Sequence, residues 1–131
     1  MKASEQKNIE PTKSELEILQ VLWSNGPSTV RQVNDYLNKE KRDIQYTGTL
    51  KLMQIMAEKG LLNRDESQMK HIYSAAVEEH KTKSFLLDRF INSIYNGSAS
   101  QLMMQLIGNK KTSKKELEEI RKMLNKPGND K

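Results

Sequence analysis

The side chains best suited to contact another molecule recur along the segment 43–60, DIQYTGTLKLMQIMAEKG. At about 100° per residue, a helix in this segment gathers four polar side chains on one face. These are Thr47, Lys51, Gln54 and Glu58. Hydroxyl, amide and ammonium groups donate hydrogen bonds to phosphates and meet base edges in the major groove of DNA. The sequence therefore predicts a helix that reads DNA.

An ordinary solvated helix face is the alternative interpretation of this pattern, and Gly48 argues against it. Glycine destabilises the interior of a helix, so it is expected there only where another surface must come close. Leu50 and Ile55 flank the polar face without an evident place in the core. Either one of them contacts a thymine methyl group or both pack on the preceding helix.

The ends of this helix follow from its capping residues. Thr47 is the predicted N-cap, because its hydroxyl can accept a hydrogen bond from an amide of the first turn. Gly60 is the predicted left-handed residue that ends the helix after Lys59. The face opposite the polar one is predicted to enter the core. It consists of Thr49, Leu52, Met53, Met56 and Ala57.

Two helices are expected before this one. Thr12 and Glu15 form a predicted capping box that begins a helix over about residues 12–24. Its apolar stripe is Leu16, Leu19, Leu22 and Trp23. Ser28 or Thr29 caps a second helix that ends near Lys39. Its expected buried residues are Val30, Val33, Tyr36 and Leu37.

Two short strands are expected after the third helix, over 61–65 and 70–75, with a polar tip between them. Ile72 alternates with His71 and Tyr73, as a half-buried strand requires. Three helices followed by a strand pair is the order of a winged helix-turn-helix. The predicted fold class is therefore mostly α with a small β-wing, followed by a three-helix region.

Three amphipathic helices are expected in the second half of the chain. Ser98 is predicted to cap a helix over 99–107, and Thr112 or Ser113 to begin the last helix together with Glu116. Such short helices bury too little apolar surface to be stable alone, so a second copy of the chain is expected to cover them. The predicted dimerisation residues are Phe85, Leu86, Phe90, Ile94, Leu102, Met103, Leu106, Ile107, Leu117, Ile120 and Leu124.

Composition limits the function. The formal net charge of +5 and the pI near 9.4 permit a nucleic-acid partner. The chain has no cysteine, which excludes disulfides and thiol chemistry. The sequence has neither a signal peptide nor an apolar run of roughly 20 residues, so a cytoplasmic protein without direct membrane binding is expected.

The ionisable residues do not form a pattern typical of catalysis or metal binding. His71 and His80 lack a set of carboxylates at ligand spacing. Asp35, Asp43 and Asp65 make no catalytic pair. We therefore expect no enzymatic activity, no catalytic residue, no metal and no cofactor.

A series of motifs runs along the chain in one order. They are ELEILQVLW at 15–23, STVRQV at 28–33, YTGTLKLMQIMAEKGLL at 46–62, HIYSA at 71–75 and YNGSASQLMMQLI at 95–107. In this order and spacing the chain resembles the penicillinase repressor family of winged-helix transcriptional repressors, over about residues 12–124. The resemblance implies a homodimeric repressor that binds an inverted-repeat operator in double-stranded DNA.

Four regions are expected on this basis. They are a disordered arm 1–11, a winged-helix DNA-binding domain 12–76, a helical dimerisation domain 77–125 and a flexible tail 126–131. The expected DNA contacts lie at the start of the second helix, on the third helix and in the wing. They are Ser28, Thr29, Arg31, Gln32, Tyr46, Thr47, Gly48, Leu50, Lys51, Gln54, Arg64 and Lys70.

The resemblance also implies how such a repressor is switched off. In family members that control β-lactam resistance, a membrane sensor with a zinc protease domain triggers a cut between Asn and Phe, in the helix after a Gly-Ser step. Aligning that step with Gly97 and Ser98 places the cut at Gln105 and Leu106, where this chain has no Asn-Phe pair. A membrane-bound sensor or protease is therefore an expected partner, with cleavage within 102–107.

Two other functions stay open from the sequence. The winged helix is either a protein-interaction module whose basic residues are incidental, or part of a regulator that senses a small ligand. The second needs a sizeable apolar pocket, which short C-terminal helices do not suggest. Salt-dependent binding to duplex DNA separates a repressor from the protein-interaction module.

Overall fold

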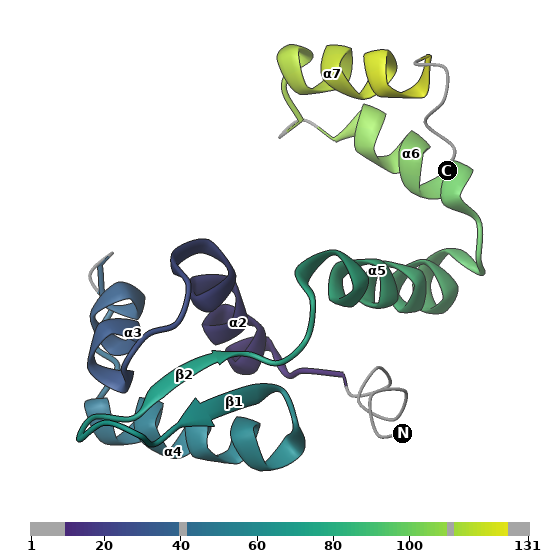
Figure 1. The fold of residues 1–131 in the computed structure, drawn as a ribbon. Coiled ribbons are helices and arrows are strands. Elements are labelled where there is room, and N and C mark those ends of the chain that lie inside the picture. Colours follow the sequence, from purple (N-terminus) through teal and green to yellow (C-terminus); the bar gives the residue numbers. More distant parts are fainter. Residues whose placement is uncertain (1–9, 40–41, 110–111, 126–131) are drawn as a thin grey trace. The chain divides into compact units, whose positions relative to one another are not determined.

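The computed structural model describes residues 10–39, 42–109 and 112–125. The chain divides into two compact units, Met1–Leu86 and Leu87–Lys131 (Figure 1). Most of the predicted arm and all of the predicted tail lie outside the described residues. Pro11, the last residue of the predicted arm, is buried, so the ordered part of the first unit begins before the first helix.

Three helices form the first half of the first unit. They are α2 (Lys13–Asn25), α3 (Val30–Leu37) and α4 (Tyr46–Lys59). The predicted capping box of Thr12 and Glu15 is present, and Thr29 caps α3 through a second box with Gln32. Gly60 ends α4 in the left-handed conformation, with φ of 88°, as predicted.

The prediction that Thr47 caps α4 is wrong. The N-cap lies two residues earlier, at Gln45, which makes no side-chain cap hydrogen bond, and the helix begins at Tyr46. The cause lies in the preceding connector, where the Asn38 carboxamide accepts from the backbone amide of Ile44 at 2.7 Å and donates to its carbonyl at 2.9 Å. The connector is therefore fixed by α3, and Thr47 is left exposed in the first turn of α4.

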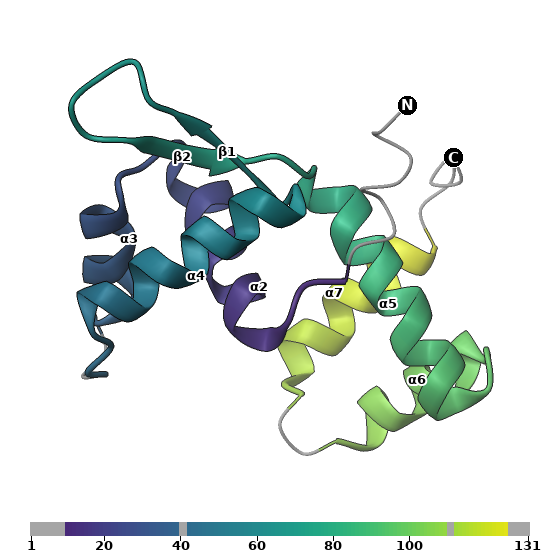
Figure 2. The ribbon, with the colours of Figure 1, turned by 90° about the horizontal axis from the view of Figure 1, so that it is seen from below.

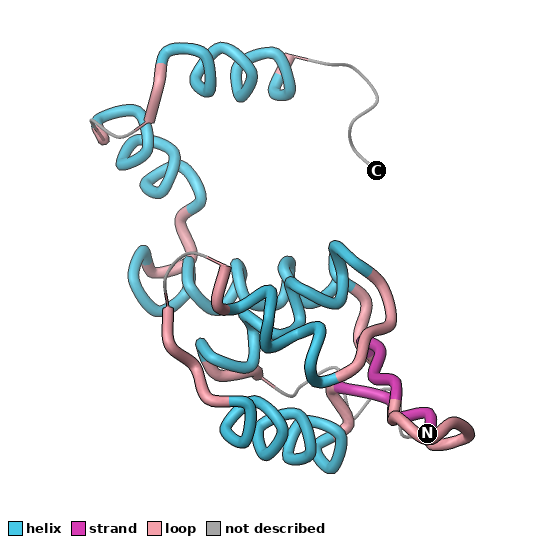
Figure 3. The backbone as a smooth tube through the Cα atoms, turned by 90° about the vertical axis from the view of Figure 1, so that its left-hand side faces the viewer, coloured by secondary structure: helices cyan, strands magenta, loops and turns pink. Residues whose placement is uncertain are grey.

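The wing is a two-stranded antiparallel hairpin of β1 (Leu62–Asp65) and β2 (Ile72–Ala75), in which Leu62 pairs with Ala75. Figure 3 shows this hairpin, while the rest of the described chain is made of helices and loops. The free edge of β2 also pairs with the segment before α3, because Ser28 and Tyr73 exchange backbone hydrogen bonds of 2.9 and 2.8 Å. The wing is thus attached to the start of α3.

A single apolar core fills the first unit. β1 packs on α4 and β2 on α2 (Figure 2). The buried apolar residues are Ile18, Leu19, Leu22, Val30, Val33, Met53, Met56, Leu61, Leu62 and Tyr73. Of the predicted core face of α4, Thr49 is also buried, and Leu52 and Ala57 are half-buried.

Two expectations about burial are wrong. Tyr36 is exposed, because its ring lies against the Lys39 ammonium, 4.6 Å from the ring centroid, instead of against the core. In β2 the buried residue is Tyr73, while Ile72 is half-buried. Tyr73 belongs to the core cluster, and its backbone is paired on both sides, by β1 and by Ser28, which places β2 in the middle of the extended segments.

A buried carboxylate connects the first turn of α2 to the last residue of α4. The Glu15 side chain is 3% exposed, and its Oε2 accepts a 2.7 Å hydrogen bond from the Lys59 ammonium at the end of α4. Burial raises the pKa of Glu15, but the Lys59 ammonium and the Thr12 amide together outweigh burial and lower the pKa below its usual value. Glu15 therefore caps α2 and holds α4 with the same carboxylate.

The second unit is helical. Helix α5 (Glu79–Tyr95) begins in the first unit and continues into the second, which also contains α6 (Ala99–Gly108) and α7 (Lys114–Leu124). Ser98 caps α6, as predicted, and Ser113 caps α7 in a box with Glu116. None of the described residues of this unit is buried. Among the helices that the structure describes, none combines the length and apolar character needed to cross a membrane.

The Glu15–Lys59 pair makes a prediction about stability and pH. Glu15→Gln keeps the capping box, because a glutamine carbonyl also accepts from the Thr12 amide, but it removes the ion pair. At pH 7 we expect the free energy of unfolding to fall by about 1–2 kcal/mol. A lowered folded-state pKa contributes stability above pH 4.5, the ordinary value. That contribution is lost as the pH falls through the folded-state pKa. The free energies of unfolding of the wild type and of Glu15→Gln should therefore converge in acid.

Urea unfolding of both proteins between pH 3 and 7 measures this difference. The matched control is Glu17→Gln, which removes the 3.1 Å ion pair between Glu17 and Arg42. Both groups of that pair are substantially exposed, so its loss should cost less than about 1 kcal/mol. A Glu15→Gln difference that stayed constant down to pH 3 would contradict the assignment.

Candidate nucleic-acid interface

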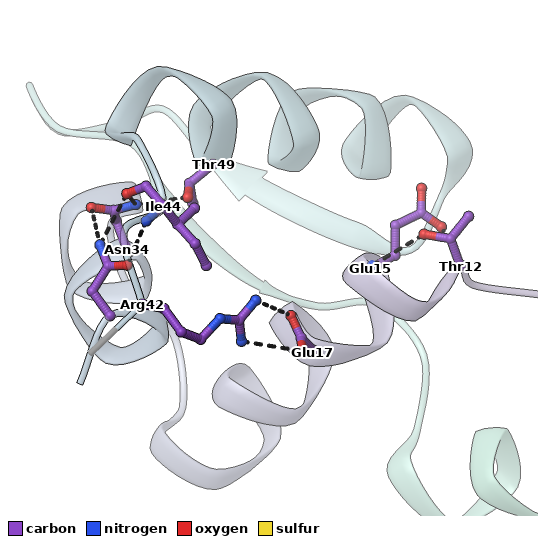
Figure 4. Close-up of polar contacts among 8 residues, drawn as sticks. Thr12, Glu15, Glu17, Asn34, Arg42, Ile44 and Thr49 are labelled. Atoms are coloured by element: carbon purple, nitrogen blue, oxygen red, sulfur yellow. Dashed lines mark hydrogen bonds and ion pairs between the residues drawn. The ribbon is translucent and has the colours of Figure 1, made fainter. Parts of the chain in front are cut away.

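A buried amide holds α3 against α4. The Asn34 Nδ2 donates to the Thr49 hydroxyl at 2.8 Å and to the Ile44 carbonyl at 3.0 Å. Both Asn34 and Thr49 are buried. Figure 4 shows Asn34 pointing from α3 towards the connector and the start of α4. A buried polar group must be paired, so this contact fixes how the two helices of the helix-turn-helix meet.

The face of α4 turned away from this contact carries the predicted DNA-reading residues. Thr47, Lys51, Gln54 and Glu58 are all exposed. Gly48 lies about a quarter turn around α4 from the centre of this face, beside a pocket lined by Ser14, Glu17 and Arg42, and a Cβ added there would meet no atom within 4 Å. The fold itself therefore does not require glycine at this position, while a partner that approaches α4 closely would.

Basic and aromatic groups of α3 lie beside the start of α4. The Arg31 guanidinium lies 4.3 Å from the centre of the half-buried Tyr46 ring, a cation–π contact between the two helices. This contact brings together two of the predicted DNA contacts. Tyr36 and Lys39 form a second such pair on α3. Their spacing of three residues could have indicated it, but the apolar pattern of the helix assigns Tyr36 to the core.

The start of α3 is less open than predicted. Ser28 is buried, and its hydroxyl donates to the Gly26 carbonyl at 2.9 Å. The DNA contact predicted for Ser28 is therefore not available in this structure. The Thr29 hydroxyl accepts a hydrogen bond from the Gln32 backbone amide, and the Gln32 side-chain carbonyl accepts one from the Thr29 backbone amide. Gln32 itself is exposed, and its amide NH₂ remains able to donate.

The wing presents mixed charges. Arg64 and Lys70 are exposed, as a phosphate contact requires, but the Arg64 Nε lies 2.6 Å from the Glu66 carboxylate. Asp65 accepts from the Ser67 amide at 2.9 Å, and this hydrogen bond lowers the pKa of Asp65. Of the two predicted wing contacts, Lys70 is thus the one whose charge is not offset by an ion pair within the described residues.

Leu50 and Ile55, which the sequence left without a clear place, separate in the structure. Leu50 is half-buried and packs against the core. Ile55 is exposed, on the face that also carries Lys51. The two histidines are exposed, and no group of three or more metal-binding side chains occurs in the described part of the chain.

The predicted dimerisation residues fall into two groups. Phe90, Ile94 and Ile107 are exposed, and the others whose side chains are described are half-buried. These are Phe85, Leu86, Leu102, Met103, Leu106, Leu117 and Ile120. The side chain of Leu124 lies outside the described residues. Gln105 and Leu106, at the position of the implied cut, lie inside α6, where Gln105 is exposed.

The fold and this face of α4 define a winged helix-turn-helix protein, the class in which the second helix of the motif enters the major groove. The family model described as Penicillinase repressor matches residues 11–126. The chain therefore belongs to the penicillinase repressor family, as its motifs predicted.

Relatives of similar length support this assignment. The Penicillinase repressor of Staphylococcus aureus is 23% identical, over 91% of this chain and 94% of the relative. The Methicillin resistance regulatory protein MecI of Staphylococcus aureus (strain N315) is 25% identical, over 92% and 97%. The Penicillinase repressor of Bacillus licheniformis is 24% identical, over 90% and 91%. The likeness thus extends over both units.

Gly48 provides a test in which stability and binding change in opposite directions. Gly48→Ala should raise the free energy of unfolding by about 1 kcal/mol, because alanine is the better helix former and the added methyl group meets nothing. It should weaken binding to duplex DNA, because the methyl group occupies the surface that the DNA approaches. Thermal unfolding and fluorescence anisotropy measure the two effects.

Gly108→Ala is the matched control. It makes the same change at the end of α6, where the added Cβ also meets no atom within 4 Å. DNA affinity should be unchanged in this variant. Full DNA affinity in Gly48→Ala would show that no partner comes close to this part of α4.

Proposed function

We propose that the protein is a homodimeric transcriptional repressor that binds a palindromic operator in double-stranded DNA, acting in the cytoplasm. One observation carries the proposal: the exposed face of α4 bears Thr47, Lys51 and Gln54, and the buried Asn34 contact holds that face outward. Relatives that match over both units bear the names of repressors, which agrees with this role.

Each element has a part in this proposal. Helix α4 enters the major groove, where Gln54 reads a base edge and Lys51 binds a phosphate. Arg31, which contacts the Tyr46 ring, binds the phosphate backbone of the DNA next to the groove. The first backbone amides of α3, which follow the N-cap Thr29, bind the same phosphates. Lys70 places the wing on the adjacent backbone.

The second unit supports a dimer. Its helices leave large apolar side chains in contact with water, including Ile94, which is 58% exposed. A unit whose described residues include no buried one cannot supply its own core, and a second copy offers the same apolar side chains in return. Two heads joined in this way match the two half-sites of a palindrome.

Release from DNA is proposed to follow a signal from a membrane-bound sensor, by a cut within 102–107 or by a signal that leaves the chain intact. Gln105 is exposed in α6, but a protease needs an extended chain, so α6 has to open locally first. The intact mass of the protein recovered from induced cells distinguishes the two routes.

Binding to DNA is tested by fluorescence anisotropy on a duplex selected from a random pool by the full chain. Lys51→Ala should weaken binding to all sequences and reduce the slope of log K against log salt by about 0.9, the value for one phosphate that is no longer neutralised. Gln54→Ala should cost about 1–3 kcal/mol at one base pair and relax the preference there, with the salt slope unchanged.

Three outcomes would contradict the proposal. Full affinity in both variants would remove α4 as the reading helix. Failure of the full chain to select any duplex would favour the protein-interaction module, and selection that depended on an added small molecule would favour a ligand-sensing regulator.

The dimer is tested by Ile94→Asp. A carboxylate at this exposed apolar position should separate the chains in sedimentation velocity, because burying it between them is costly. The loss of two joined heads should then weaken operator binding by about 10²-fold or more. The control, for sedimentation alone because the wing is itself a proposed DNA contact, is Met69→Asp at the wing tip, where the methionine is 100% exposed but lies in the first unit. A dimeric Ile94→Asp protein would place the interface elsewhere.

A further inference from the structure

Ile55 is a large apolar side chain on the face of α4 that the proposed function turns towards DNA. It is 38% exposed, while the polar residues around it on the helix, Lys51 and Gln54, are also exposed. A β-branched residue is a weak helix former, so an exposed helix position gains nothing from it. Neither helix formation nor solubility therefore accounts for an isoleucine among DNA-facing groups.

The core does not explain Ile55. Leu50, on the other flank of the exposed face, is half-buried and packs on the core cluster, as do Leu52 and Ala57. Ile55 is absent from both the buried core and the apolar side chains packed against it. Part of the Ile55 side chain is covered within the first unit, and its exposed part, 38% of the residue's surface, is open to a partner.

The spacing along α4 places Ile55 within reach of the same groove as Gly48. Gly48, Lys51 and Ile55 follow one another at intervals of three and four residues, so they form one stripe along the helix. Seven residues span about 10 Å of helix axis. A Cβ added at Gly48 would meet no atom within 4 Å, and the hollow beside it is lined by Ser14, Glu17 and Arg42, so in this stripe Lys51 and Ile55 are the side chains turned towards a groove.

The major groove offers one apolar group to such a side chain. Base edges there present hydrogen-bond donors and acceptors, except for the 5-methyl group of thymine. We propose that Ile55 reads the methyl group of a thymine in each half-site and is thereby a specificity-determining residue. This inference rests on the proposed function, since it requires that α4 enter the major groove.

The test combines Ile55→Ala with the removal of single methyl groups from the DNA. In the duplex selected by the full chain, each thymine is replaced in turn by deoxyuridine, which changes only the 5-methyl group. At one thymine of each half-site, wild-type affinity should fall about fourfold, the factor that burial of one methyl group supplies. Replacing both symmetry-related thymines should give about 15-fold. Ile55→Ala should bind the duplex with thymine at these positions and the duplex with deoxyuridine there equally.

Gln54→Ala is the matched control, because it weakens base reading on the same face but should keep the full loss on methyl removal. Thermal unfolding confirms that each variant is folded. An operator in which no thymine responds to deoxyuridine overturns the inference and leaves the proposed function intact. The same result follows if Ile55→Ala keeps the full loss. Failure to select any duplex overturns both the inference and the proposed function.

Discussion

The hydrogen bonds of the buried Asn34 amide determine where α4, the proposed reading helix, lies. An unpaired amide in this position would cost a large part of a small domain's stability, so α3 and α4 are confined to the arrangement that pairs it with Thr49 and Ile44. The neighbouring Asn38 fixes the backbone of Ile44 from both sides. The first residue of α4, and therefore which residues face outward, follow from these two asparagines and not from a local capping signal.

This dependence explains what the sequence predicted and what it did not. Elements defined by local signals were found as expected, among them the Thr12 and Ser98 caps and the left-handed Gly60. The start of α4 was misplaced at Thr47, because it is set by side chains from another helix. The inward turn of Tyr73 was missed for a similar reason. It depends on pairing with Ser28, a residue far away in the sequence.

Positive charge is distributed less evenly than the net charge suggests. Lys59 and Arg42 are paired with Glu15 and Glu17, where they hold the first unit together. Arg64 is paired with Glu66 in the wing. In the part of the chain that the structure describes, Lys51 and Lys70 take part in no ion pair. A prediction from net charge counts every lysine and arginine equally. In the structure, some of these side chains form ion pairs within the first unit, and others stay unpaired and able to bind a phosphate.

The first unit buries an apolar core of its own, whereas the described part of the second unit does not, and this difference connects stability to the proposed DNA binding. The first unit closes a core of its own, so a single reading head can remain folded whatever happens to the second unit. The second unit buries none of its described residues, so in the proposed dimer its order would depend on contact with another chain and hence on concentration. Affinity for a palindrome depends on two joined heads. In the proposed mechanism, a signal that opened α6 would therefore lower DNA affinity without altering any of the residues proposed to contact DNA.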